Sequence, residues 1–189
     1  MISRLLVLAL AVAPASKLTD WVNSDAGDAR TLTFKDKAGD HAVKFQISRL
    51  KSKVVDDAEL KSQQLVVVHT IGKKELWRAK DFVEKCEFDL SLDVIDDSIE
   101  VTDLDVDGEA EVSFLYRTGC RSDVSPLTVK LLMYEGTTKY ALRGESRERV
   151  GEAEWAGGTY KVDVAFQKAP DMFLPFAKAK WERLVNVAR

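Results

Sequence analysis

The residues with the clearest chemical content lie in a short acidic loop near the middle of the chain. The segment 103–111 reads DLDVDGEAE and carries an acidic residue at every odd-numbered position. Alternate side chains of a tight turn converge on one point, and Gly108 permits the backbone to reverse after the third aspartate. Calcium takes roughly six to eight oxygen ligands, and Glu109 could add its backbone carbonyl. We therefore predict a possible Ca²⁺ site formed by Asp103, Asp105, Asp107, Glu109 and Glu111.

The sequence after the loop indicates which kind of calcium loop this is. An EF-hand needs a glutamate at its twelfth position, where this chain has Phe114, and the residues from Glu111 onward alternate as in a strand. The segment therefore resembles the strand–loop–strand calcium hairpins of integrin-type (FG-GAP/VCBS-like) repeats. The resemblance gives Glu111 the role of the acid that completes the ligand shell, but Val106 stands where those loops usually carry glycine. The alternative is a solvated acidic turn between two strands.

The N-terminus predicts export. A short basic start, Met1 to Arg4, precedes the apolar run Leu5 to Ala13, and Ala13-Pro14-Ala15 has the small-x-small pattern of a cleavage site. The run is shorter than the roughly 20 residues that a permanent membrane helix needs. We expect a signal peptide over 1–15, a single β-rich domain over 16–189, no transmembrane segment in the mature chain, and a periplasmic, cell-surface or secreted location.

Charge and cysteine content narrow the function further. The net charge is −3 and the charged residues are well mixed, without the basic stripe of a nucleic-acid-binding protein. In an oxidising compartment, the pair Cys86 and Cys120 predicts a disulfide, which the loop-entropy model values at roughly 3–4 kcal/mol. His41 and His69 lie in separate apolar segments without cysteine or carboxylate at ligand spacing. We expect them to be ordinary strand residues rather than zinc ligands.

Most of the chain shows the alternation of β-strands. Hairpins are predicted around the turn 36–40 and around 72–74, with a central strand over 65–71. Strands are also predicted at 88–94, 98–102, 111–117, 128–134 and 139–143, and a long loop or splayed hairpin at 144–158. An amphipathic helix follows Pro170, with Pro175 delaying its start or kinking it and Lys180 reaching along its apolar face to solvent. The predicted class is α+β, β-dominant: antiparallel meander sheet(s) with one C-terminal amphipathic helix packed on the sheet.

A second group of polar residues lies beside Cys120. Arg121, Asp123 and Ser125 could line a shallow polar pocket together with Lys130 and Arg143. Alternatively, Arg121 and Asp123 cap or pair within a surface turn before Pro126, since such turns are rich in these residue types.

From residue 81 onward the chain resembles a family of bacterial exported proteins named as surface polysaccharide biosynthesis proteins. The matching motifs are Asp81–Cys86, Val101–Asp105, Asp107-Gly108, Cys120–Pro126, Lys130–Met133, Lys139–Gly144, Gly157-Gly158, Phe176–Lys178 and Lys180-Trp181. They cover roughly the C-terminal three fifths of the chain. The resemblance implies an envelope role and brings no catalytic residues with it.

Two functions follow as hypotheses. The first is a non-enzymatic binding or structural module, stabilised by a disulfide and Ca²⁺, whose partner is an envelope polysaccharide or another surface protein. No nucleophile–base–acid set and no phosphate-binding glycine loop stands out in the sequence. The second is a carbohydrate-active enzyme of cell-surface polysaccharide metabolism that uses paired carboxylates. Glycoside cleavage needs two such carboxyl groups held about 5–10 Å apart across a cleft.

Overall fold

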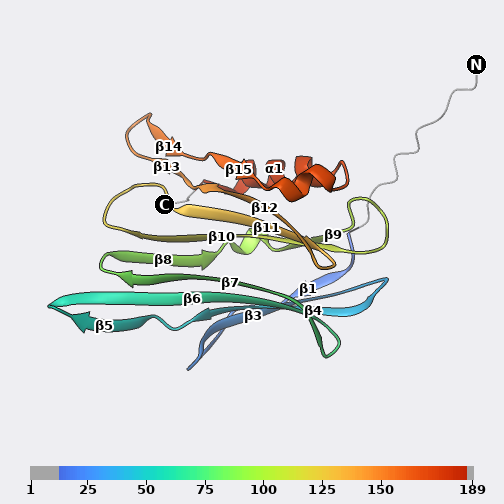
Figure 1. Cartoon of the computed structure of the whole chain (residues 1–189), viewed down its shortest axis with the longest axis horizontal. Helices are drawn as coiled ribbons and strands as arrows, with labels where there is room; N and C mark the ends of the chain where they lie inside the picture. The colour runs from blue at the N-terminus through green and yellow to red at the C-terminus, as the bar shows by residue number, and fades with distance from the viewer. Residues whose placement is uncertain (1–12, 187–189) are drawn as a thin grey trace, which may run out of the picture.

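The computed structural model describes residues 13–186, in which two large antiparallel sheets and a C-terminal helix form three layers, with a small two-stranded sheet besides (Figure 1). The predicted class, α+β with β dominant, is therefore confirmed. Residues 1–12 and 187–189 lie outside the described part, and with them most of the predicted signal peptide.

The first layer, which we call the N-terminal sheet, has seven strands in the order β1-β3-β4-β6-β5, with β2 paired to β3 and β7 paired to β6. Its strands are β1 (Ser16–Leu18), β2 (Val22–Ser24), β3 (Gly27–Asp36), β4 (Gly39–Ser48), β5 (Lys51–Val55), β6 (Ala58–Ile71) and β7 (Lys74–Cys86). The two predicted hairpins are β3–β4 and β6–β7. The predicted central strand is β6, which lies between β4 and β7.

The second layer, the C-terminal sheet, has six strands in the order β15-β12-β11-β10-β8, with β9 paired to β10. Its strands are β8 (Asp89–Val94), β9 (Glu100–Thr102), β10 (Glu111–Arg121), β11 (Thr128–Glu135), β12 (Thr138–Glu145) and β15 (Tyr160–Val162). The predicted loop or splayed hairpin contains a small hairpin, β13 (Arg147–Arg149) with β14 (Trp155–Gly157). Two short 3₁₀ helices cover Asp96–Ser98 and Val164–Lys168, and the α-helix α1 covers Phe173–Leu184.

The two sheets pack face to face around an aromatic core. Phe45 of the N-terminal sheet meets Phe114 of the C-terminal sheet edge to face, with ring centroids 5.1 Å apart. Trp77 stacks on Tyr134 with centroids 3.8 Å apart. Aromatic pairs of this kind add about 0.5–1.5 kcal/mol to the burial of their surface. The contact holds the β3–β4 hairpin next to the acidic loop.

The other face of the C-terminal sheet is covered by α1, so this sheet is buried on both sides. Leu115, Leu131 and Met133 pack against Phe173, Ala177 and Trp181 of the helix. The helix begins at Phe173, and Pro175 falls in its first turn, where a missing N–H breaks no intrahelical bond. Lys180 does not reach solvent as predicted: its ammonium is buried and donates to Glu100 and Ser113, because the helix places this side chain over the sheet.

Candidate metal centre

The acidic loop joins two strands that pair with each other. Thr102 of β9 lies opposite Glu111 of β10, and Val101 lies opposite Val112, so the predicted pairing of the flanking strands is confirmed. Within the loop, Val106 and Gly108 both have positive φ, 61° and 84°. Glycine adopts this conformation freely, whereas for the β-branched Val106 it is strained.

The loop brings carboxylates together in two overlapping groups. Asp103, Asp105 and Glu111 each offer an oxygen, and these atoms lie within 4.8 Å of one another; Asp105, Asp107 and Glu135 do the same. Glu135 comes from the end of β11, directly opposite Glu111 in the strand register. These groups could bind a metal ion, since carboxylate oxygens are the preferred ligands of hard divalent cations.

Glu111 is the buried member of the first group. The residue is 0% exposed. Its Oε2 accepts hydrogen bonds from Thr102 Oγ1 at 2.7 Å and from the Leu104 N–H at 3.0 Å. Its Oε1 is buried and has no hydrogen-bond partner among the described residues. Burial raises the pKa of this carboxyl, and an unpartnered buried carboxylate oxygen is costly unless another group binds it.

Glu135 is half-buried, and its side chain has neither a hydrogen bond nor an ion pair in the part of the chain that the structure describes. Burial, and then the nearby charges of Asp105 and Glu111, raise its pKa to about 7. Sequence patterns did not reveal Glu135 as a candidate ligand because it is distant from the acidic loop in the chain. The signal was available, since pairing the predicted strands 111–117 and 128–134 in register brings the next residue, Glu135, to the loop.

Asp103 and Asp107 organise the loop backbone. The carboxylate of Asp103 accepts hydrogen bonds from the N–H groups of Asp107 at 3.1 Å and Gly108 at 3.2 Å. Asp107 Oδ1 accepts one from the N–H of Glu109 at 2.6 Å. Such short-range bonds are the ordinary way in which aspartates stabilise turns. They hold the loop in the conformation that groups its carboxylates.

Lys37, in the β3–β4 turn of the N-terminal sheet, reaches the outer side of the loop. Its Nζ lies 2.7 Å from Asp107 Oδ2 and 3.6 Å from Glu109 Oε2. Its backbone N–H donates to Gly108, and the neighbouring Asp36 accepts from the N–H of Ala110. Of the five predicted ligands, Asp107 and Glu109 thus have an internal cation, and Glu109 lies in neither of the two acidic groups.

The two histidines lie together, although the sequence analysis treated them separately. His41 Nε2 is 2.7 Å from Asp36 Oδ1, and His41 Nδ1 is 2.8 Å from His69 Nε2. Both rings point into the sandwich between Phe34 and Trp77. Burial lowers the pKa of His69 to about 4. The cluster fixes Asp36, and through it the contact with the acidic loop.

The predicted disulfide between Cys86 and Cys120 is present and joins β7 of one sheet to β10 of the other. Beside it, Arg121, Asp123 and Ser125 line a hollow of about 410 Å³. Arg121 donates to the carbonyl of Ser125 and to Glu148, and Ser125 N–H donates to Asp123. These hydrogen bonds agree with the alternative predicted from the sequence, in which Arg121 and Asp123 cap or pair within a surface turn.

Lys130 and Arg143 do not line this hollow. They face each other across β11 and β12, and each has its own carboxylate partner. Lys130 pairs with Asp81 at 2.5 Å, and Arg143 with Asp163 at 2.8 Å. The five residues of the predicted polar pocket are therefore divided between two places.

Comparison with protein-family models, with curated proteins and with solved structures finds no match. Among residues 13–186, no helix has both the length and the apolar character needed to cross a membrane. The arguments below therefore depend on the chemistry of the residues.

Proposed function

We propose that the protein is an exported, non-enzymatic binding or structural module in which Ca²⁺ at the acidic loop stabilises the fold. The observation that carries the proposal is Glu111, a fully buried carboxylate with one unpartnered oxygen, grouped with Asp103 and Asp105. The disulfide is compatible with an oxidising compartment. An envelope polysaccharide or another surface protein remains the proposed class of partner, as the family resemblance suggests.

The charge of the site supports a bound cation. Glu111 and Glu135 face each other across β10 and β11, and like charges directly opposite one another destabilise a sheet. Lys37 neutralises Asp107 and Glu109 instead of these two. A divalent cation between Asp103, Asp105 and Glu111 would convert their mutual repulsion into coordination.

The donor set favours calcium over other divalent ions. Every candidate ligand is a carboxylate, and no histidine or cysteine belongs to either acidic group. Oxygen-only sites suit Ca²⁺ and Mg²⁺, whereas Zn²⁺ and Cu²⁺ favour nitrogen and sulfur. Ca²⁺ accepts irregular shells of about six to eight oxygens from separate segments, while Mg²⁺ demands near-octahedral geometry. Ligands from a strained loop and a neighbouring hairpin suit the more tolerant ion.

The test is thermal unfolding of the oxidised protein in Ca²⁺ and in a chelator. We expect a higher melting temperature in Ca²⁺, since a ligand at 100 times its dissociation constant stabilises a protein by about 2.7 kcal/mol. Asp105→Ala should remove the difference. Asp123→Ala, which changes an exposed aspartate outside the acidic groups, should retain it. Identical wild-type curves with and without Ca²⁺ would overturn the metal site.

The alternative proposal, an enzyme with paired carboxylates, has Asp123 as its candidate in a hollow. Hydrogen bonds from Ser125 lower the pKa of Asp123, the opposite of what a general acid needs. No second acidic residue lines that hollow. Glu111 and Glu135 have raised pKa values, but a bound cation would keep them ionised. We therefore favour the binding or structural module.

A further inference from the structure

The two sheets differ in what covers their outer faces. Helix α1 covers the C-terminal sheet, whereas no element of residues 13–186 lies over the outer face of the N-terminal sheet (Figure 1). Strand register places Lys44, Val68 and Arg78 in one row across β4, β6 and β7, and Gln46, Val66 and Lys80 in the next. This open surface carries lysines between small apolar side chains.

The open face is basic although the chain as a whole is acidic. Lys44, Lys51 and Lys80 are exposed and make no ion pair with any described residue. Arg78 forms an ion pair with Glu75. Of the acidic residues near this face, Glu84 is the one without an ion pair among the described residues. Lys44 and Lys80 lie two strands and two residues apart in the register, roughly 12 Å at about 4.8 Å per strand and about 3.4 Å per residue, whereas Lys51 lies four to six residues further along β6. Unpaired cations gathered on one face attract a polymer that carries several negative charges.

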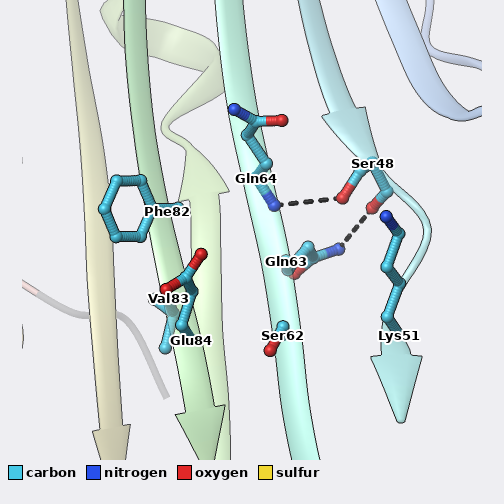
Figure 2. Close-up of a pocket in the computed structure, with 8 residues that line it drawn as sticks. All are labelled: Ser48, Lys51, Ser62, Gln63, Gln64, Phe82, Val83 and Glu84. Atoms are coloured by element: carbon cyan, nitrogen blue, oxygen red, sulfur yellow. Dashed lines mark hydrogen bonds between the residues drawn. The ribbon is translucent and has the colours of Figure 1, made fainter.

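At one end of this face, two interruptions of the sheet coincide and form a notch. β4 ends at Ser48 and β5 begins at Lys51, so β6 has no strand partner on that side at Gln63 and Gln64. The register of β6 with β7 also shifts at this point, and Lys85 has a φ of 54°. The gap is closed by hydrogen bonds from Gln63 Nε2 to the Ser48 carbonyl and from the Gln64 N–H to Ser48 Oγ (Figure 2).

The notch has a volume of about 230 Å³ and unusual walls. The Phe82 side chain is 57% exposed and projects from β7, opposite Gln64 (Figure 2). The side-chain amide of Gln64 and the charged ends of Lys51 and Glu84 have no partner among the described residues. An exposed ring face beside free amide and charged groups can bind a molecule with both C–H faces and hydroxyls. Sites for drug-sized ligands measure roughly 300–1,000 Å³, so this notch suits a single sugar ring.

We propose that the outer face of the N-terminal sheet binds an acidic polysaccharide. Phe82 and Gln64 contact one sugar ring in the notch, and Lys44 and Lys80 bind carboxylate or phosphate groups of neighbouring sugars. Around Lys44 and Lys80 the apolar side chains of the face are Val66 and Val68, which are half-buried, and the exposed ring of Phe82 lies beside them. A single exposed ring among polar and charged groups offers little apolar area for insertion into a lipid bilayer, which favours a glycan over a membrane. The site lies outside the acidic loop, and its argument does not depend on Ca²⁺.

The test is affinity electrophoresis of the oxidised protein in gels that contain polygalacturonate, with dextran as the neutral polymer. A chelator is present throughout, because the carboxylates of the polymer themselves bind Ca²⁺. We expect retardation by polygalacturonate only. The double variant Lys44→Gln/Lys80→Gln should bind roughly tenfold more weakly and Phe82→Ala about fivefold more weakly. The double variant Lys168→Gln/Lys178→Gln loses the same charge from exposed positions near α1, and it should bind like wild type.

Two further polymers separate the proposal from simple charge attraction. Polyglutamate has carboxylates without sugar rings, and vesicles of phosphatidylglycerol present phosphate on a lipid surface. Both should bind more weakly than polygalacturonate. Absence of retardation, equal loss in both double variants, or tighter binding to polyglutamate or vesicles would each overturn the proposal. Because no Ca²⁺ is present, none of these results bears on the cation site.

Discussion

Two glutamates are fully buried in this protein, and their surroundings differ. Glu148 of β13 is 1% exposed, and its Oε1 accepts hydrogen bonds from Ser146 Oγ at 2.8 Å and from Arg121 at 3.2 Å. Glu111 is 0% exposed and has only neutral donors on one oxygen and none on the other. The fold therefore supplies an internal cation to one buried carboxylate and not to the other. This difference supports the proposal that Glu111 binds a cation from outside the chain.

Removal of Glu148 gives the largest effect that the comparison predicts. Glu148→Ala leaves Arg121, whose side chain is 22% exposed, without its carboxylate, and Ser146 without an acceptor. Breaking a buried ion pair costs about 3–5 kcal/mol, and partial exposure of Arg121 places the expected loss near the lower value. Denaturant unfolding should show this loss equally in Ca²⁺ and in a chelator. A loss that depends on Ca²⁺ would contradict the comparison.

Glu111→Gln should behave in the opposite way. Without Ca²⁺ the substitution removes a buried charge next to Asp103 and Asp105, so we expect the free energy of unfolding to stay within about 1 kcal/mol of wild type. With Ca²⁺ the variant should lack the stabilisation of about 2–3 kcal/mol expected for wild type. Calorimetric titration with Ca²⁺ measures the same loss directly. A variant that still binds Ca²⁺ as tightly as wild type would remove Glu111 from the site.

Lys180 extends the comparison to a buried cation. Burial lowers its pKa to about 8, even though Glu100 and Ser113 accept hydrogen bonds from it. The folded pKa is below the unfolded value, so the unfolded chain retains the proton as pH rises from about 8 to 10.5. Stability should therefore increase with pH in this window, by up to about 1.4 kcal/mol per pH unit. Urea unfolding at pH 8 and pH 9.5 measures this increase in the wild-type protein. In Lys180→Met the increase should be absent.

The smallest expected effect concerns Val106, which has a positive φ and is 53% exposed. Val106→Gly relieves backbone strain of about 1 kcal/mol and removes few contacts. We expect the free energy of unfolding to rise by up to about 1 kcal/mol and the Ca²⁺ affinity to stay within about twofold of wild type, since the strained conformation is already present without the ion. Denaturant unfolding measures the first and calorimetric titration the second. Weaker binding by the glycine variant would show that Val106 supports the loop through contacts instead.

Local sequence patterns predicted the strands and the helix well, but they could not predict contacts between residues that are distant in the chain. Alternation located the β3–β4 hairpin and the strands around the acidic loop, because one buried face fixes a period of two residues. It could not show that Lys37, about seventy residues before the loop, binds Asp107. Helical spacing placed Lys180 at the surface, because it does not reveal that Glu100 and Ser113 lie beneath the helix. Glu135 was missed for the same reason, and so was the contact between His41 and His69, which were expected only to be strand residues: the pairing of strands brings these residues to their partners.

Two of the links between the sheets lie at opposite ends of β10, and the ion pair of Lys130 with Asp81 joins β11 to β7 between them. Near Cys120 the link is covalent, and near Glu111 it consists of the bonds from Lys37 and Asp36 to the loop. These ends are about 30 Å apart along the strand. The disulfide therefore joins the sheets at one end of β10 whether or not the polar contacts at the other end form. Under the proposed function, Ca²⁺ concentration would set the stability of the loop end, and redox conditions that of the disulfide end.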